Sequence, residues 1–323
     1  MTGASFHRGT VQDAHPLPPR LIIGTSLGLF PSNPKGIASS RPDFASSVVS
    51  TFTSETETIT VALVPELSTI LIASLGVLFI GISKAGFGGG LGILTTPICV
   101  LAFDAEGRAP TFAVGTLLPL LCAGDAFSLW HYWGKWEPKN LKYLLPGVVV
   151  GVIIGVQLMD HFSPRQTNLA IGVLALSFVT FQLVKERLFR AEGAFAPNHA
   201  IGIPCGIGAG ITSTFAHGAG PLVSVFLIPQ RLPKEIFVGT TVLVFTCINW
   251  IKMPFFVAQG IITRETLLMG LYYFALVPLG VWLGVWLNRR FSERMFLKVV
   301  YVLVFLAGLQ LIFDFNFAKL LRR

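Results

Sequence analysis

Long apolar runs are the feature that most constrains how this chain of 323 residues can fold. Residues 266–287 carry no charged side chain, and residues 111–130 carry only one, Asp125. A helix of about 20 apolar residues is long enough to cross a bilayer. Only 12% of the residues are charged, whereas a soluble domain has about 25%. The sequence therefore predicts an all-α polytopic membrane protein.

The basic residues give a net charge of +8, which by itself could suggest nucleic-acid binding. They lie between the apolar runs, where membrane topology places them, and do not gather on one solvated module. The four cysteines lie inside apolar runs without paired spacing, so we expect small buried side chains and neither a disulfide nor a metal site. They are Cys99, Cys122, Cys205 and Cys247.

No constellation typical of an enzyme is present in the sequence. There is no HExxH, no paired Cys/His ligand set and no GxSxG. The glycines at 88–90 are followed by Leu91 without the Lys-Ser/Thr of a phosphate-binding loop. We therefore expect no enzymatic activity, no cofactor, no metal and no nucleic-acid partner.

The first 60 residues differ from the rest, being rich in Ser, Thr and Pro and without a long apolar run. We expect residues 1–60 to be a disordered extension. The alternative is a start codon assigned too early, with a true start near Val61 that would need a codon other than that for Met. Beyond this extension, the sequence predicts one membrane repeat over residues 61–190 and a second over residues 191–323.

The membrane part contains ten apolar pieces, of which eight are about long enough to span a bilayer and two are too short. The eight long pieces are residues 61–83, 111–130, 143–159, 168–184, 200–216, 236–251, 266–287 and 295–313; the two short ones are residues 93–103 and 219–228.

Three short motifs recur once in each half, in the same order and at the same places in the apolar pattern. Residues 113–117 match 237–241, residues 151–158 match 280–287, and residues 87–92 match 215–220, at shifts of 124, 129 and 128. The first shift places Asn249 opposite Asp125. Because the shifts differ only by loop length, they indicate an internal duplication.

Loop charges predict the relative orientation of the two halves. In the first half, the first of two matched loops is the more basic: it carries Lys135, Lys139 and Lys142, whereas the next loop carries Arg165. In the second half the order is reversed: the first loop carries Arg264, whereas the next carries Arg289, Arg290 and Arg294. Positive loops tend to stay in the cytoplasm, so equivalent loops lie on opposite faces. We therefore expect two inverted repeats of about five apolar segments each, although the basic C-terminus argues against this orientation.

Glycine-rich segments at matching positions indicate a short broken or re-entrant helix in each repeat. They are residues 83–92 and 212–221. A broken helix frees N–H groups and the positive end of a helix dipole, which attract anions. Such breaks at matching positions are typical of a transporter site, so we expect substrate contacts from Gly88, Gly89, Gly90, Gly218 and Gly220.

Charged or titratable side chains beside the breaks are further candidates for the site. Lys84 either faces a cavity or extends to the headgroups. His217 either couples a proton or donates to an anion, or it is a structural histidine bonded to backbone. Lys252 either pairs with Asp125 across the repeats or extends to the headgroups, the second alternative being favoured slightly.

One acidic residue, several neutral polar side chains and some small residues complete the set of candidates. Asp125 and Asn249 either form a proton or Na⁺ site or hold a helix break by hydrogen bonds. Thr212, Ser213 and Thr214 either donate hydroxyls to an oxyanion or bond their own helix. Two small-xxx-small pairs, Gly151 with Gly155 and Gly280 with Gly284, predict helix packing only. Trp130, Trp133 and Trp136 are typical of an interfacial aromatic belt.

The run of residues 84–90 (KAGFGGG), Pro97 after it, residues 114–116 (VGT) and residues 217–221 (HGAGP) together resemble the TauE/SafE family of sulfite exporters. The resemblance covers about residues 65–315. It implies a bacterial inner-membrane transporter of small anions, chiefly sulfite and organosulfonates, with its site between two repeats. The long N-terminus departs from the family pattern, and so does His217 where a plain glycine run is expected, which puts substrate and coupling in question.

Three functions compete at this point. The first is a secondary transporter that exports a small sulfur-containing anion by alternating access, coupled to protons or to the membrane potential. The second is a passive anion channel. The third is a non-transporting membrane scaffold, and the duplicated breaks argue against it.

Overall fold

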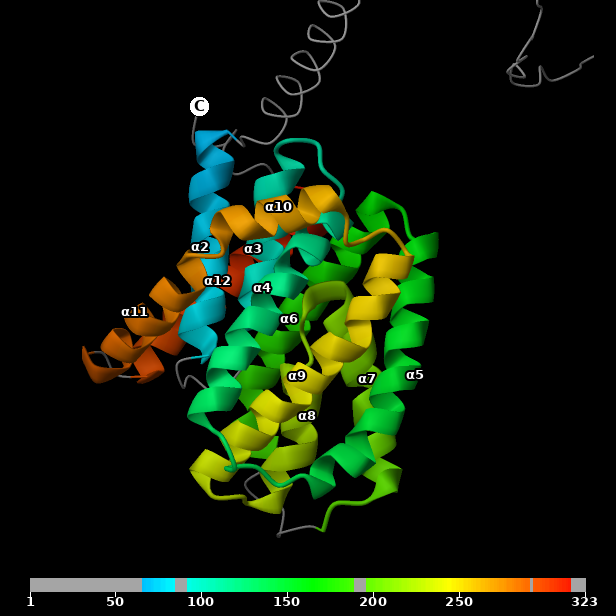
Figure 1. Ribbon diagram of the computed structural model, residues 1–323, viewed down its shortest axis with the longest axis vertical. Coiled ribbons are helices and arrows are strands. Elements are labelled where there is room, and N and C mark those ends of the chain that lie inside the picture. The colour runs from blue at the N-terminus through cyan, green and yellow to red at the C-terminus, as the bar shows by residue number, and fades with distance from the viewer. Residues whose placement is uncertain (1–65, 85–91, 189–195, 291–292, 315–323) are drawn as a thin grey trace, which may run out of the picture. The chain divides into compact units, whose positions relative to one another are not determined.

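A computed structural model describes residues 66–84, 92–188, 196–290 and 293–314. These residues form helices without a strand among them (Figure 1). The first half of the described chain contains α2 (Leu67–Lys84), α3 (Gly92–Asp104), α4 (Pro110–His131), α5 (Lys139–His161) and α6 (Pro164–Leu188). The second contains α7 (His199–Ala216), α8 (Gly220–Leu227), η1 (Ile228–Gln230), α9 (Lys234–Ala258), α10 (Arg264–Tyr273), α11 (Leu276–Arg290) and α12 (Glu293–Phe313).

Five of these helices are long and apolar enough to cross a membrane, namely α2, α4, α5, α6 and α9. On α5, Val150, Ile154 and Leu158 are at least 36% exposed, which suits contact with lipid and would be unfavourable in water. The described chain is therefore an all-α, multi-pass membrane protein, as the apolar runs predict.

The expectation of eight continuous spans is too high. Residues 266–287 do not form one helix but α10 and α11, which are bent by 43° relative to each other and count as one broken span at most. Pro278 lies in the first turn of α11, and a proline there lacks the N–H that would continue the hydrogen bonding from α10. The glycine-rich α7 and the described apolar part of α12 are also not among the helices that are long and apolar enough to cross a membrane.

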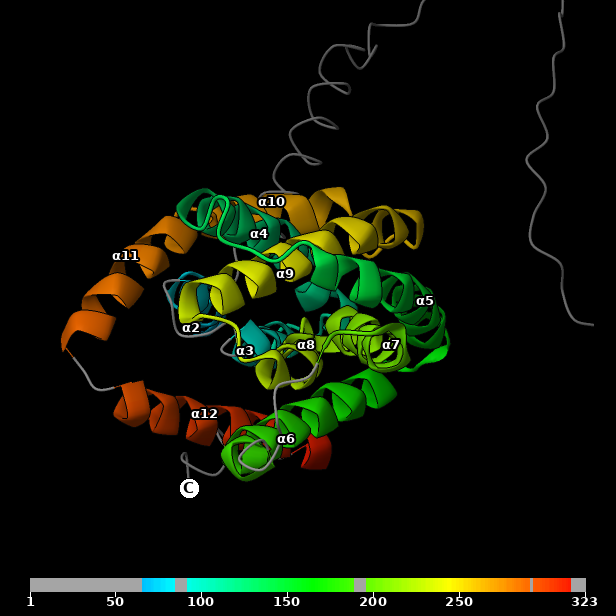
Figure 2. The same ribbon diagram turned by 90° about the horizontal axis from the view of Figure 1, so that it is seen from below.

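The helices of the two halves pack in matching pairs. Helix α5 packs along α7, and α11 packs along α2. Both contacts rely on glycine, since a side chain at Gly151 would collide with backbone of α7 and one at Gly280 with backbone of α2. Figure 2 shows α6 beside α12 on one side and α4 beside α9 and α10 on the other, with α2, α3, α7 and α8 between them.

Helices at equivalent places in the two halves run in opposite directions. The loop after α4 passes Gly239 near the start of α9, and the loop after α9 passes Gly115 near the start of α4, so α4 and α9 are antiparallel. Helices α6 and α12 are antiparallel too, because Arg165 at the start of α6 donates to the Leu311 carbonyl oxygen near the end of α12 (2.8 Å). The inversion of the repeats stays a prediction, and these two antiparallel pairs favour it.

Candidate functional site

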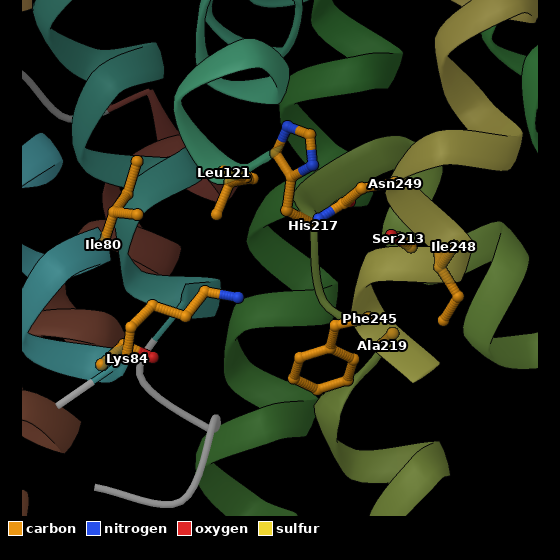
Figure 3. A pocket seen from close by; sticks show the side chains of 10 residues that line it. Ile80, Lys84, Leu121, Ser213, His217, Ala219, Phe245, Ile248 and Asn249 are labelled. Atoms are coloured by element: carbon orange, nitrogen blue, oxygen red, sulfur yellow. The ribbon is translucent and has the colours of Figure 1, made fainter. Parts of the chain in front are cut away.

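The ends of α2 and α7 meet at a small buried cavity. Lys84 is the last residue of α2, and His217 caps the C-terminus of α7. Figure 3 shows both side chains at this cavity, with Phe245 and Asn249 of α9 beside them. The lining residues are Ile80, Ser83, Lys84, Leu121, Ser213, His217, Ala219, Phe245, Ile248 and Asn249.

The cavity is small in this conformation. The centre of a water-sized sphere can occupy about 30 Å³ of it. One water needs roughly 10–15 Å³ in this measure. The free space is therefore that of two or three water molecules, so a bound ion has to be compact or has to displace a side chain.

Lys84, Asp125 and Asn249 form a buried chain of polar contacts across the two halves. The Lys84 ammonium forms an ion pair with the Asp125 carboxylate, and the two side chains are 7% and 0% exposed. Asn249 Nδ2 donates to the other carboxylate oxygen of Asp125 at 2.7 Å. The predicted duplication matches Asn249 with Asp125, and on that prediction the two halves touch through equivalent positions.

Lys252 is held by the C-terminal end of α7. Its ammonium donates to the Ser213 carbonyl oxygen at 2.9 Å and to His217 Nδ1 at 2.8 Å. His217 Nε2 lies 3.1 Å from the Val114 carbonyl oxygen of α4. A carbonyl oxygen can only accept, so Nε2 carries the proton, Nδ1 accepts from Lys252, and the imidazole is neutral.

When both of its lysines are protonated, this cluster carries one positive charge in excess. Lys84 and Lys252 are two buried cations, and Asp125 is the buried carboxylate between the halves. No described carboxylate forms an ion pair with Lys252, which is 0% exposed. The negative end of the α7 dipole offsets part of that charge. A buried excess cation in a membrane protein favours an anion as the missing partner.

His217 adopts a left-handed backbone conformation, with φ 51° and ψ 28°. This conformation is unfavourable for residues with a side chain, and glycine is the usual choice at a helix C-terminus. The conformation ends α7 and places the imidazole between Lys252 and Val114. The break expected near His217 is therefore present, and α8 starts three residues later at Gly220.

Only one of the three hydroxyl residues on α7 lines the cavity. Thr212 donates to the Gly208 carbonyl oxygen (2.9 Å) and Thr214 to that of Gly210 (2.9 Å), so both bond their own helix. Ser213 lines the cavity, and its hydroxyl bonds no other described residue. Ser83 at the end of α2 is a second hydroxyl on the cavity.

The structure places the remaining candidates as follows. Gly88, Gly89 and Gly90 lie outside the described residues. Gly218 packs against Ile93 of α3, and Gly220 starts α8. Both alternatives for Lys252 are wrong, because it neither pairs with Asp125 nor reaches the headgroups.

Several apolar residues that line the cavity were not predicted from the sequence, although their spacing along the helices could have indicated them. Ile80, Leu121 and Phe245 each lie four residues before a polar site residue, namely Lys84, Asp125 and Asn249. Residues four apart share one helix face. The apolar lining could therefore have been found one turn before each polar residue. Among the described residues, no group of three His, Cys, Asp or Glu side chains could hold a metal ion.

Comparison with known proteins gives one match. Residues 73–311 match the family described as Sulfite exporter TauE/SafE, over most of the chain. No curated protein and no solved structure matches the chain.

Proposed function

The chain belongs to the Sulfite exporter TauE/SafE family, and from this premise we propose that it is a secondary transporter that exports a compact sulfur oxyanion such as sulfite. We place it in the bacterial inner membrane, as the family resemblance implies. The two repeats would expose the cavity between α2 and α7 alternately to the two sides of the membrane.

The excess positive charge at the cavity is the observation that carries this proposal. Lys84 faces the cavity, while Lys252 lies directly behind Ser213 and His217. Hydroxyls of Ser83 and Ser213 and the Asn249 amide surround the same space. Such donors suit an oxyanion, because each of its oxygens accepts hydrogen bonds.

The size of the cavity favours a small inorganic anion over an organosulfonate. The room for two or three water molecules suits sulfite, once Lys84 turns from Asp125 towards the anion. An organosulfonate brings an additional carbon chain, for which the described lining leaves no space in this conformation. Sulfite is therefore the first ligand to test.

The membrane potential supplies a driving force in the direction of export. Moving one negative charge out of a negative-inside cell gains about 2.3 kcal/mol for each 100 mV. Proton coupling is not needed for net export on this view.

The packing of the two halves supports alternating access. Equivalent helices α4 and α9 run antiparallel and meet through Asp125 and Asn249. A site at the contact between antiparallel repeats can open to either side when one half rocks against the other.

Flux of labelled sulfite into and out of proteoliposomes tests the proposal. We expect saturable flux and counterflow, in which unlabelled sulfite on one side drives labelled sulfite from the other. Flux without counterflow would identify a passive channel. If sulfite, sulfate and thiosulfate all move no faster than in empty liposomes, the proposed transport is wrong.

A further inference from the structure

A second, larger hollow adjoins the cavity at the C-terminal end of α4. The centre of a water-sized sphere can occupy about 490 Å³ of it. Its described lining consists of Lys84, Phe127, Ser128, Trp130, His131, Tyr132 and Val281. We call this hollow the vestibule. Trp130 is 81% exposed beside it, at the end of the spanning helix α4, so the vestibule lies at the level of the membrane interface.

Lys84 is the residue that the vestibule and the inner cavity share. Its stem lies against Gly124, where a Cβ atom would come within 3.5 Å of Lys84 Cγ and 3.8 Å of Cε. The absence of a side chain at Gly124 leaves the space that the stem occupies. The Lys84 side chain therefore stands between the two spaces.

The two members of the ion pair, Lys84 and Asp125, differ in how freely their side chains can move. Asp125 is fully buried in the middle of α4 and is fixed a second time by Asn249 (2.7 Å). Lys84 lies at the end of α2 and carries its ammonium on four flexible methylene groups. When the ion pair opens, the lysine is the partner that moves.

The vestibule has the chemistry of a route for anions. Ser128, His131 and Tyr132 supply polar groups, and no acidic side chain is among the described residues that line it. Its space exceeds that of the inner cavity by far, so a hydrated anion fits in the vestibule but has to shed water to pass Lys84.

We propose that the vestibule is the route by which the anion reaches the inner cavity, and that the Lys84–Asp125 ion pair closes this route. The arriving anion takes the Lys84 ammonium from Asp125, which keeps its hydrogen bond with Asn249. On release, Asp125 recaptures Lys84 and closes the route again. This inference rests on the proposed function, because it concerns access to the same site.

Two cysteine reporters test the route in a full-length chain whose four native cysteines are replaced by alanine. His131→Cys reports on the vestibule, which it lines from an exposed position, and Ser213→Cys reports on the inner cavity. A methanethiosulfonate reagent with a sulfonate group is used, and the rate of labelling is followed by mass spectrometry. We expect fast labelling of His131→Cys, which is exposed, and slow labelling of Ser213→Cys, which is buried.

Opening the Lys84–Asp125 ion pair should change the labelling rate of Ser213→Cys only. Asp125→Asn keeps the shape of the side chain and removes its charge, so labelling of Ser213→Cys should rise at least about tenfold, because a buried ion pair is strongly coupled. Asp125→Glu keeps a carboxylate and should leave that rate low. Lys84→Gln removes the cation of the same ion pair and should also raise the labelling rate of Ser213→Cys. Labelling of His131→Cys should stay the same throughout.

Equal labelling of Ser213→Cys in the parent, Asp125→Asn and Lys84→Gln chains would overturn this role of the ion pair. Slow labelling of His131→Cys would overturn the vestibule as the route. Sulfite binding to the purified parent, measured by thermal shift, is scored separately. Binding together with equal labelling rates contradicts the closure alone, whereas absence of oxyanion binding contradicts the proposed function.

Discussion

At the scale of single residues, the site depends on the way Lys252 is held in an apolar environment. A buried ammonium without a carboxylate partner is costly, and the structure offsets that cost with the Ser213 carbonyl oxygen and His217 Nδ1. His217 can accept only because its other nitrogen donates to Val114. The strained backbone of His217 is what brings the imidazole to this position. Three helices, α4, α7 and α9, thus cooperate to hold one positive charge.

Replacing Lys252 by methionine should weaken anion binding while keeping most of the side-chain volume. The loss should be about 2 kcal/mol, roughly thirtyfold, since a unit charge about 8 Å away contributes this much at an effective dielectric constant near 20. The measurement is the dissociation constant for sulfite of the purified protein. Lys142→Met is the matched control, because it removes the same charge from an exposed position. Parental affinity in Lys252→Met would contradict the role given to this charge.

Removing Lys84 alone should destabilise the protein more than removing both partners of its ion pair. Lys84→Met leaves Asp125 buried without a cation, which costs about 3–5 kcal/mol. Lys84→Met combined with Asp125→Asn leaves no uncompensated charge, so much of that loss should be recovered. Thermal unfolding of the two single variants and the double variant in detergent measures the coupling. Simple addition of the two single effects would argue against a tight pair.

At the scale of helices, the matched Val-Gly-Thr motifs have a common structural reason. A Cβ atom at Gly115 would collide with the Ile261 carbonyl oxygen, and one at Gly239 would collide with that of Lys135. In each case the backbone of the loop that follows the equivalent helix of the other half lies directly on the glycine. The motif recurs because the same close approach is built twice, at opposite ends of the pair α4 and α9.

Alanine at Gly239 should therefore destabilise the protein even though alanine favours a helix. The collision is with backbone, which cannot move easily, and overpacking of this kind costs typically about 1–3 kcal/mol or more. Gly208→Ala is the control, because its new methyl group would meet only the flexible end of Leu222. It should be neutral, or stabilising by up to about 1 kcal/mol. Melting temperatures of the two variants check the difference, and equal values would contradict the close contact at Gly239.

At the scale of the whole described unit, one ion pair joins the two halves at each end. Arg108 before α4 pairs with Glu265 of α10, and Lys135 after α4 pairs with Glu235 of α9 (3.0 Å). These pairs are partly exposed and contribute little to stability. They lie at the places where two rocking halves would separate, so they suit contacts that form and break during transport.

A cross-link between the loop after α4 and the start of α9 should stop sulfite transport without abolishing sulfite binding. A reducible thiol cross-linker joins Lys135→Cys to Glu235→Cys in a chain without its native cysteines. Alternating access requires this end to open, so we expect sulfite flux in proteoliposomes to stop and to return on reduction. Sulfite binding should persist. The same reagent on each single-cysteine variant is the control, and undiminished flux through the linked protein would indicate a channel.

Part of this protein could be predicted from its sequence alone. The runs of apolar residues determine the all-α membrane class, because only a helix satisfies its own backbone hydrogen bonds in lipid. The motif shifts predict which helices are equivalent, and the polar residues within apolar runs single out Lys84, Asp125, His217, Asn249 and Lys252, since such side chains are rarely placed in a membrane without a partner.

Only the tertiary structure decided which of these residues meet. Sequence spacing orders side chains along one helix, whereas Lys84 and Asp125, or Lys252 and His217, lie on different helices and meet through packing. Helix packing also decided that Thr212 and Thr214 bond their own helix while Ser213 lines the cavity, because neighbouring residues on a helix point in different directions. The cavity, its excess charge and its connection to the vestibule are properties of that packing.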